Sequence, residues 1–364
     1  MGVRKSSLEG VAMKEESFWN GRRVLVTGHT GFKGSWLCRI LIGAGAEVTG
    51  YSLEPPTQPN LYSMAGLEGR MESVTGDVRD MAHLAEVFRK ARPEAVFHLA
   101  AQPIVRESYR DPRYTYETNV MGTVHVMECI RQTPGVITAV NVTTDKVYLN
   151  NEDGRDFREE DPLDGFDPYS NSKSCSELVT HSYIRCFFQK ADTPAVSTAR
   201  AGNVIGGGDF ARDRLIPDCV RAVAAGERIT VRNPGSVRPF QHVLEPLAVY
   251  MTVAEKQTKD RKYAGYYNVG PEKDDCLTAG ELTELFCRKW GSGAVWASRP
   301  EENAPHEAGC LRLDTGKIRE AFGWKPRWRI GRAVEETVNW TRVWLNGGDI
   351  PAEMDREIEA FLEA

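Results

Sequence analysis

The chain has 364 residues, of which 41% are hydrophobic and 27% are charged, and its formal net charge is -5. That is enough apolar material for one large core or two joined cores. A mildly acidic balance with no basic block argues against binding to nucleic acid or to an anionic membrane. No apolar run approaches the roughly 20 residues that span a bilayer, and no apolar stretch before Trp19 is long enough for a secretory signal. We therefore expect a cytoplasmic protein with no nucleic-acid or membrane partner.

The start of the chain and the cysteines suggest no specialised role. Met1-Gly2 with Ser6 fits a loose myristoylation pattern, but we favour a flexible N-terminal extension over residues 1–17. The eight cysteines form no C-x-x-C pair and show no zinc-ligand spacing. In a chain with a full core we expect reduced, mostly buried thiols and no metal site.

The first half of the chain alternates short β-branched runs with helical patterns. Strands are predicted over residues 24–27, 47–52, 71–75, 95–99, 139–142 and 195–199. Helices are predicted between them over residues 35–42, 82–90, 117–131 and 170–189. This alternation is typical of a doubly wound parallel Rossmann sheet with helices on both faces, an α/β fold.

After Gly202 the pattern changes to Gly- and Pro-rich loops. Helices are predicted near residues 214–225, 247–256 and 279–290. We expect a smaller mixed α/β domain over the carboxyl ends of the strands, formed by roughly 203–239 and 271–364. The Rossmann domain then comprises 18–202 and roughly 240–270, a stretch that is expected to return to the sheet.

A glycine-rich turn, G-x-x-G-x-x-G, joins the first strand to the first helix. Gly28 permits the tight turn, Gly31 lets a pyrophosphate approach the backbone, and Gly34 lets helix and strand pack closely. The N–H groups at the positive end of the helix would hold the phosphates. The turn, with Phe32 and Lys33 inside it, predicts a dinucleotide site.

Residues that follow the next strands complete this predicted site. They are Ser52, Asp77, Val78, Leu99 and Ala101. Ser52 stands where a carboxylate normally holds the ribose, so the turn by itself leaves NAD and NADP open. Asp77 has two equally good interpretations, as an acceptor for an adenine amine or as a cap of the helix beginning near Met81.

Two short motifs point to catalysis. Tyr169 and Lys173 form Y-x-x-x-K on one face of a predicted helix. A lysine cation beside a phenol lowers the tyrosine pKa from about 10 towards neutrality, so that Tyr169 could deprotonate a sugar hydroxyl. Thr144, Asp145 and Lys146 end the fifth strand, where open α/β sheets place ligands; capping of the strand end is the alternative.

Several runs of the sequence resemble the CDP-glucose 4,6-dehydratases, which belong to the extended short-chain dehydrogenase/reductase group. The resemblance covers nearly the whole chain beyond residue 17. Its runs are 28–37, 51–53, 55–57, 144–146, 200–209, 214–218, 238–246, 305–308 and 323–326.

The resemblance implies an NAD-dependent dehydratase that turns CDP-glucose into CDP-4-keto-6-deoxyglucose. Tyr169 would take the 4-hydroxyl proton, Thr144 would hydrogen-bond the 4-oxygen, and Lys173 would hold the nicotinamide ribose. Asp145 would protonate the departing 6-hydroxyl. Lys146, where related dTDP-glucose dehydratases carry Glu, is our hypothesis for the base that removes the C5 proton.

The resemblance also implies the substrate contacts and the assembly. The substrate-binding residues would be Gln102, Asn203, Arg214, Leu215, Arg232, Arg238, Asn268 and His306. A flexible Gly206-Gly207-Gly208 loop would close over the sugar nucleotide. We also expect a homodimer, or a dimer of dimers, through helices 117–131 and 170–189. The alternatives are a nucleotide-sugar 4-epimerase, a dehydratase for another nucleotide sugar, and a cofactor sensor without activity.

Overall fold

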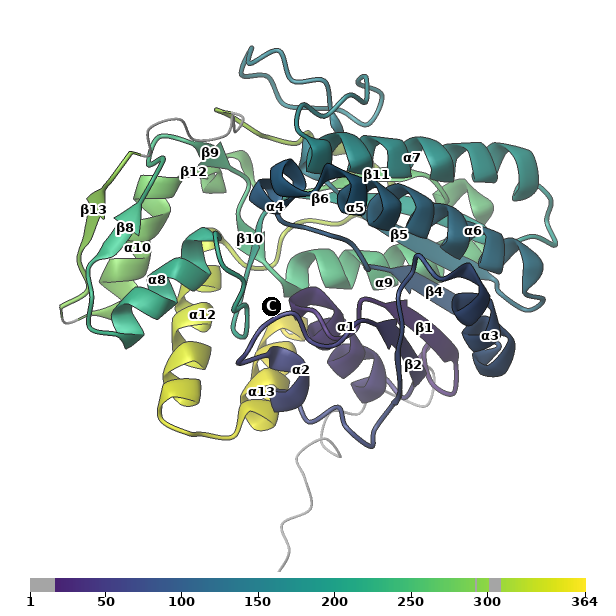
Figure 1. Ribbon diagram of the computed structural model, residues 1–364, viewed down its shortest axis with the longest axis horizontal. Helices are drawn as coiled ribbons and strands as arrows, with labels where there is room; N and C mark the ends of the chain where they lie inside the picture. The colour runs from purple at the N-terminus through teal and green to yellow at the C-terminus, as the bar shows by residue number, and fades with distance from the viewer. Residues whose placement is uncertain (1–16, 292, 301–308) are drawn as a thin grey trace, which may run out of the picture.

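A seven-stranded parallel sheet forms the centre of the computed structural model, which describes residues 17–291, 293–300 and 309–364 (Figure 1). The strand order is β11-β6-β5-β4-β1-β2-β3, and every neighbouring pair is parallel. The strands are β1 (Arg23–Thr27), β2 (Glu47–Ser52), β3 (Glu72–Thr75), β4 (Ala95–His98), β5 (Thr138–Thr144), β6 (Ala195–Ala201) and β11 (Tyr266–Val269). The predicted Rossmann sheet is confirmed, and each of its six predicted strands is found within two residues of the expected bounds.

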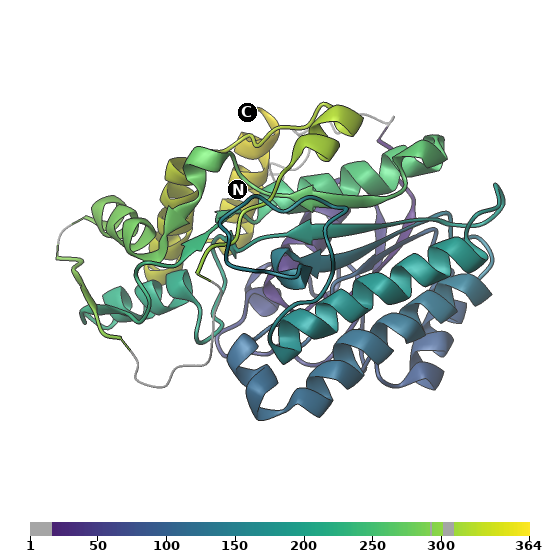
Figure 2. The same ribbon diagram turned by 90° about the horizontal axis from the view of Figure 1, so that it is seen from above.

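Helices cover both faces of this sheet, and Figure 2 shows the two layers from above. One layer contains α1 (Phe32–Gly43) and α9 (Leu244–Lys259), and the other α3 (Met81–Ala91), α6 (Gly122–Gln132) and α7 (Pro168–Phe187). Successive side chains of a strand point to opposite faces. Val24 and Val26 therefore join the core under α1 and α9, while Leu25 joins the core under α3 and α6.

The predicted helix 117–131 is longer than expected and is interrupted. It begins as α5 (Pro112–Tyr116), passes through a π-helical turn (Glu117–Met121) and continues as α6. Asn119 in the π turn accepts from the backbone N–H of Gln102 at 2.8 Å and donates to Ser172 Oγ at 2.9 Å. The π turn thus joins the loop after β4 to α7, and such turns are frequent beside functional sites.

A second apolar core lies beside the sheet, at the left of Figure 1. Its elements are α8 (Leu215–Ala224), β8 (Ile229–Val231), α10 (Ala279–Trp290), β13 (Trp296–Ser298) and α12 (Ile330–Leu345). Three two-stranded sheets accompany it, β8 with β13, β7 (Val204–Ile205) with β10 (Gln241–His242), and β9 (Val237–Arg238) with β12 (Leu277–Thr278). The helices α2 (Leu61–Met64), α4 (Val105–Arg110), α11 (Gly316–Phe322) and α13 (Ile350–Leu362) complete the fold.

Packing at the end of the chain bears on the expected division into two domains. Trp340 of α12 and Met354 and Phe361 of α13 belong to the same core as α1 and α9, although 271–364 is expected to be part of the second domain. β11 pairs with β6 through Tyr266 and Thr198. The division into two domains stays a prediction. Among the described residues, no helix is both long and apolar enough to cross a membrane.

Candidate active site

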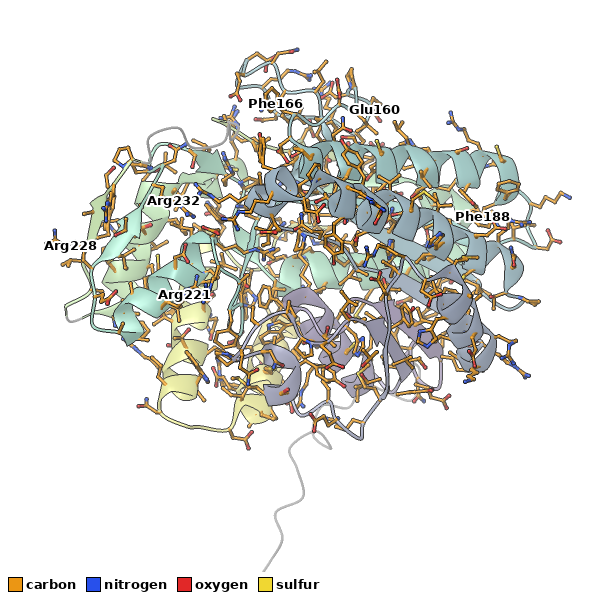
Figure 3. All side chains as sticks on the ribbon, in the orientation of Figure 1. Glu160, Phe166, Phe188, Arg221, Arg228 and Arg232 are labelled. Atoms are coloured by element: carbon orange, nitrogen blue, oxygen red, sulfur yellow. The ribbon has the colours of Figure 1, made fainter. Side chains whose placement is uncertain are left out.

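A cleft of about 1660 Å³ lies at the carboxyl ends of the parallel strands. It is lined by the glycine turn, by the residues that follow β2, β4, β5 and β6, and by α8 and β8. Figure 3 places Arg232 beside β8 and Phe166 on the loop before α7, and both residues line the cleft. Open α/β sheets bind their ligands at this edge, so the cleft is the candidate active site.

The glycine turn has the shape of a dinucleotide site. Gly28 has φ +76°, and a Cβ there would lie 2.7 Å from the backbone nitrogen of Ala100. A Cβ on Gly34 would collide with the Gly28 carbonyl, whereas a Cβ on Gly31 would meet only that carbonyl, at 3.4 Å. α1 then begins with no side-chain cap and no acidic residue in its first turn. Its N–H groups are left for an anion, so the turn fits a pyrophosphate.

The other predicted cofactor residues line the same cleft. Ser52 Oγ lies 2.8 Å from Thr30 Oγ1, which fixes the serine to the turn. Asp77 accepts from the backbone N–H of Arg79 at 2.9 Å, and Arg79 lowers the Asp77 pKa despite partial burial, which acts to raise it. The cap of α3 is Asp80, which accepts from His83 N at 3.0 Å. The capping interpretation of Asp77 is therefore wrong.

The predicted catalytic tyrosine and lysine project from the start of α7. Asp167 caps this helix through Ser170 N, and Pro168 occupies its first turn. Pro fits that position because its missing N–H would have no partner there. Tyr169 and Lys173 are then 9% and 5% exposed, inside the cleft.

Two residues at the end of β5 contact the first two turns of this helix. Lys173 Nζ donates to the Val142 carbonyl at 3.1 Å, and Thr144 hydrogen-bonds with the Tyr169 phenol. Thr144 Oγ1 also donates to Asp145 Oδ1 at 2.9 Å. The predicted catalytic residues are thus brought together by one strand end and one helix start.

The ionisation of Tyr169 differs from the expectation. Burial raises the pKa of Tyr169 to about 12, and the Thr144 hydrogen bond and the Arg214 charge only partly offset it. Burial also lowers the pKa of Lys173 to about 8. The predicted lowering of the Tyr169 pKa by Lys173 is not found, because the amine donates to a backbone carbonyl instead.

Asp145 and Lys146 form an ion pair behind Thr144. Lys146 Nζ donates to Asp145 Oδ1 at 2.9 Å and to Asn203 Oδ1 at 3.1 Å. Asp145 is completely buried, and its Oδ2 has no hydrogen-bond partner among the described residues. The predicted acid and the hypothetical base are thus in direct contact.

The amine of Lys33 lies near more charged groups than its position in the glycine turn indicated. It lines the cleft, and burial lowers its pKa to about 7, with the charges of Arg214 and Lys173 acting in the same direction and Asp145 opposing them. The sixth residue of a glycine turn carries no sequence signal for such a position. The fold alone brings this amine to the predicted catalytic residues.

Most of the predicted substrate residues also line the cleft. They are Gln102, Asn203, Arg214, Leu215, Arg232 and Arg238. Arg214 and Arg232 are held by carboxylates, Asp209 at 3.1 Å and Asp213 at 2.6 Å. Guanidinium groups held in this way are ready for a diphosphate. His306 lies outside the described residues.

Asn268 does not line the cleft, although the resemblance implied a substrate contact. It is completely buried in β11, and its amide donates to the carbonyls of Phe157 and Asp314 at 2.9 and 3.1 Å. Its carbonyl accepts from Tyr148 OH at 2.5 Å. With these partners, the Asn268 side chain holds the loop after β5 against β11.

The Gly206-Gly207-Gly208 run is tightly packed, whereas a flexible closing loop was expected. Trp36 Nε1 donates to the Gly207 carbonyl at 3.0 Å, and a Cβ on Gly207 would overlap the Trp340 ring. A Cβ on Gly208, which has φ +85°, would lie 2.5 Å from Leu61. These glycines let α1 and α12 approach the chain closely.

The sequence reasoning missed a buried ion pair under the site, between Glu177 of α7 and Arg200 of β6. Both side chains are 0% exposed. A signal was available, since Arg200 interrupts an otherwise uncharged strand and Glu177 follows Lys173 by one helical turn.

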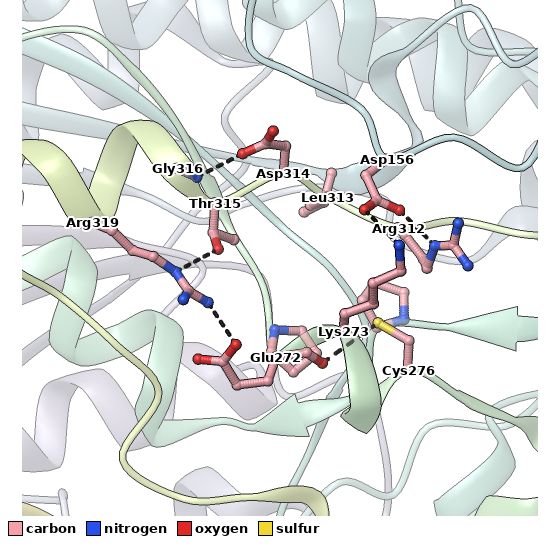
Figure 4. Close-up of a pocket in the computed structure, with 12 residues that line it drawn as sticks. Asp156, Glu272, Lys273, Cys276, Arg312, Leu313, Asp314, Thr315, Gly316 and Arg319 are labelled. Carbon is pink, nitrogen blue, oxygen red and sulfur yellow. Dashed lines mark hydrogen bonds and ion pairs between the residues drawn. The ribbon is translucent and has the colours of Figure 1, made fainter.

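A second hollow, of about 310 Å³, is separate from this cleft (Figure 4). Its charged groups are paired with one another, Arg312 with Asp156 at 2.6 Å and Arg319 with Glu272 at 2.9 Å. These pairs join the loop after β5 to the segment around Arg312, and the loop after β11 to α11.

Fold and site together define an enzyme of the extended short-chain dehydrogenase/reductase class. Solved structures with this fold include UDP-glucose 4-epimerase of Thermus thermophilus in complex with NAD, with a TM-score of 0.76 and 25% identity over 88% of this chain and 99% of that one. dTDP-glucose 4,6-dehydratase of Bacillus anthracis in complex with NAD gives a TM-score of 0.71 at 22% identity, over 88% and 96%.

The sequence comparison is more specific. The GDP-mannose 4,6 dehydratase family model matches residues 25–337, and the chain belongs to this family. CDP-glucose 4,6-dehydratase of Salmonella typhimurium is 44% identical over 357 residues, which are 97% of this chain and 99% of that protein. dTDP-glucose 4,6-dehydratase of Xanthomonas campestris is 26% identical, over 89% and 95%.

Proposed function

We propose that the chain is a lyase that converts CDP-glucose to CDP-4-keto-6-deoxyglucose and water, with NAD as cofactor. The observation that carries the proposal is that Tyr169, Lys173, Thr144 and Lys146 line one part of the cleft, with Asp145 buried in contact with Thr144 and Lys146. An epimerase needs the tyrosine and the lysine but has no use for an acid–base pair beside them. The 44% identity to a CDP-glucose 4,6-dehydratase supports cytidine as the nucleoside.

The residues present fit NAD. The glycine turn and the uncapped start of α1 would hold its pyrophosphate, and Ser52, Asp77 and Val78 line the cleft where its adenosine half would lie. When bound, NAD supplies the acceptor for hydride from C4 and the donor of the same hydride to C6.

The first task of the chain is to remove the proton of the 4-hydroxyl. Tyr169 takes this proton while Thr144 hydrogen-bonds the 4-oxygen. With a pKa near 12, Tyr169 is a neutral phenol at neutral pH, so it can take this proton only when positive charge beside it favours the phenolate. Arg214 already acts in this direction, and a bound, positively charged nicotinamide would add to it.

The second task is elimination of water, in which the Asp145–Lys146 pair transfers two protons. One goes to the departing 6-hydroxyl, and the other is removed from C5. Lys146 passes a proton across the 2.9 Å contact to Asp145, and Asp145 gives it to the departing 6-hydroxyl. The amine of Lys146 is then neutral and takes the proton from C5, which is acidic beside the new C4 carbonyl. The same ammonium returns a proton to C5 as C6 becomes a methyl group. The proton that Tyr169 gained restores the starting charge of the site.

We infer in addition that the protein is a homodimer with α6 and α7 at the contact. Met121, Leu178 and Phe187 are 46%, 50% and 47% exposed on or beside these helices. Large apolar side chains exposed along one helical layer are typical of an interface.

The test of the proposed activity incubates the NAD-loaded protein separately with CDP-, UDP-, dTDP- and GDP-glucose. We expect the alkaline absorbance of a 4-keto-6-deoxy sugar from CDP-glucose alone, with no net NADH. CDP-glucose deuterated at C4 should give a product with that deuterium on C6. A signal from another sugar nucleotide would replace the substrate, and a folded, loaded protein that is silent with all four would overturn the dehydratase proposal.

A further inference from the structure

Glu177 lies one helical turn after Lys173, inside the layer between α7 and the sheet. It accepts hydrogen bonds from Thr143 Oγ1 and from Thr198 Oγ1, the latter at 2.7 Å. Arg200 Nη2 donates to it at 2.9 Å, and His181 Nε2 lies 3.1 Å away. Groups from α7, β5 and β6 therefore converge on one carboxylate that has no contact with solvent.

The ion pair of Glu177 with Arg200 has a direction. Arg200 Nη1 donates to Tyr148 OH and to the Glu159 carbonyl, each at 2.9 Å, on the side away from α7. Glu177 is the charged group that raises the pKa of Lys173, against the larger effect of burial. The negative end of the pair therefore faces the catalytic lysine.

Consecutive residues of β5 connect this carboxylate to the catalytic groups. Val142 accepts from Lys173 Nζ, Thr143 donates to Glu177, and Thr144 hydrogen-bonds with the Tyr169 phenol. A shift of α7 along β5 would break all three contacts together.

We propose that Glu177 is a positioning residue of the active site, which fixes α7 against β5 and β6 and keeps Lys173 charged and in register with Tyr169. The contacts of Glu177 with β5 and β6 are observed in the structure and do not depend on any assumed reaction. The inference rests on the proposed function only where it assigns a catalytic role to Tyr169 and Lys173.

Other titratable groups lie near Lys173 or Glu177, so the test must separate them from Lys173. They are Lys33 of α1, His98 of β4, Asp145 after β5, Tyr169 and His181 of α7, and Arg200 of β6. Burial lowers the pKa of His98 to about 3, with the Lys173 charge acting in the same direction. His98 is therefore neutral over the range in which Lys173 titrates.

The variant Glu177→Gln keeps the size of the side chain and its carbonyl acceptor but removes the charge. Lys173 then retains the cost of burial without the compensating carboxylate, and it loses its proton at a lower pH. Because the variant also leaves Arg200 buried and unpaired, it is compared with the double variant Glu177→Gln/Arg200→Met, in which both charges are removed.

The measurement is the pH dependence of NADH binding to the full chain, followed by energy transfer from protein tryptophan. Lys173 would hold the nicotinamide ribose, so affinity should fall as the pH rises through its pKa near 8. Lys173→Met identifies this limb by abolishing it. No substrate is involved, so the result does not depend on the proposed CDP-glucose activity.

We expect the limb to move down by about one pH unit in both Glu177 variants, a tenfold change in the lysine proton equilibrium. Thr180→Val is the matched control, because Thr180 is also completely buried on α7 and hydrogen-bonded to Asn141 at 2.8 Å. It should leave the limb in place. A folded Glu177 variant with the wild-type limb would overturn the proposal and leave Glu177 a purely structural residue.

Discussion

Glu177 and Glu357 are both completely buried, yet the protein holds them in opposite ways. Burial acts to raise the pKa of Glu177, but the Arg200 charge and the hydrogen bonds from His181, Arg200 and Thr143 lower it to about 2. Glu357 of α13 has no hydrogen bond to either oxygen among the described residues. Burial raises its pKa well above the usual value, and the charges of Glu336 and Glu353 add to the effect.

The difference lies in the donors and not in the depth of burial. The nearby Arg356 donates to Glu336 and Glu353 and leaves Glu357 without a guanidinium partner. A basic group close to it is His242, whose Nε2 lies 3.3 Å from Glu357. Burial lowers the pKa of His242 to about 3, so this contact adds no positive charge. A carboxyl group is ionised in this core only where donors surround it.

The strongest test of the comparison uses Asp145, a third buried carboxylate with one bonded and one unbonded oxygen. Lys146→Met removes its cationic donor and the hypothetical C5 base. We expect turnover to fall by about 10³-fold or more, while CDP-glucose binding changes little and NADH accumulates with substrate. Absorbance at 340 nm and calorimetric titration check the two expectations. Normal turnover would remove Lys146 from the mechanism.

Arg200→Met tests Glu177, the carboxylate that is surrounded by donors. It leaves Glu177 buried without its cation, and losing one partner of a buried pair costs about 3–5 kcal/mol. Urea unfolding followed by circular dichroism measures the loss in free energy of unfolding. A loss under about 1 kcal/mol would place the pair among weak surface bridges.

Glu357→Gln tests the poorly partnered side, and its sign depends on pH. A raised folded-state pKa means that the Glu357 contribution is present at low pH and is lost as the pH rises through that value. The amide does not ionise, so the variant should have a higher Tm than wild type at pH 8, by a few degrees. The difference should shrink towards pH 4. For Glu177, with its lowered pKa, stability is instead lost as the pH falls towards 2.

Leu178→Glu should have the smallest effect on catalysis, although Leu178 is the next residue after Glu177. Its side chain is half exposed and faces away from the sheet layer. We expect the variant to be monomeric in analytical ultracentrifugation, with kcat per subunit within about twofold of wild type. A dimer that persists would move the contact away from α7.

Much of the fold was predictable because its signals are local. The strand Glu47–Ser52 and the helix Ala279–Trp290 have the predicted bounds. The helix carries a capping box between Thr278 and Glu281, a signal that lies within four residues. The glycine turn and the Y-x-x-x-K pair were equally predictable from the sequence, because spacing along a strand end or a helix face decides where such side chains point.

The errors concern groups whose partners are distant in the chain. Asn268 has an amide side chain of the kind that binds substrates, but its partners Tyr148 and Phe157 lie more than 100 residues earlier in the chain. Likewise the Gly206–Gly208 run indicates flexibility until Trp36 and Trp340 are seen to pack on it.

By itself, the sequence determined the alternation of strands and helices and the dinucleotide turn, and it predicted the catalytic side chains, since these depend on residue type and short spacing. Only the tertiary structure decided which charges are paired. It placed Lys33 among the predicted catalytic groups, joined Lys173 to Val142, and gave Glu177 the donors that Glu357 lacks among the described residues. Ionisation in a core depends on every group within a few ångströms, and the packing of distant segments chooses those groups.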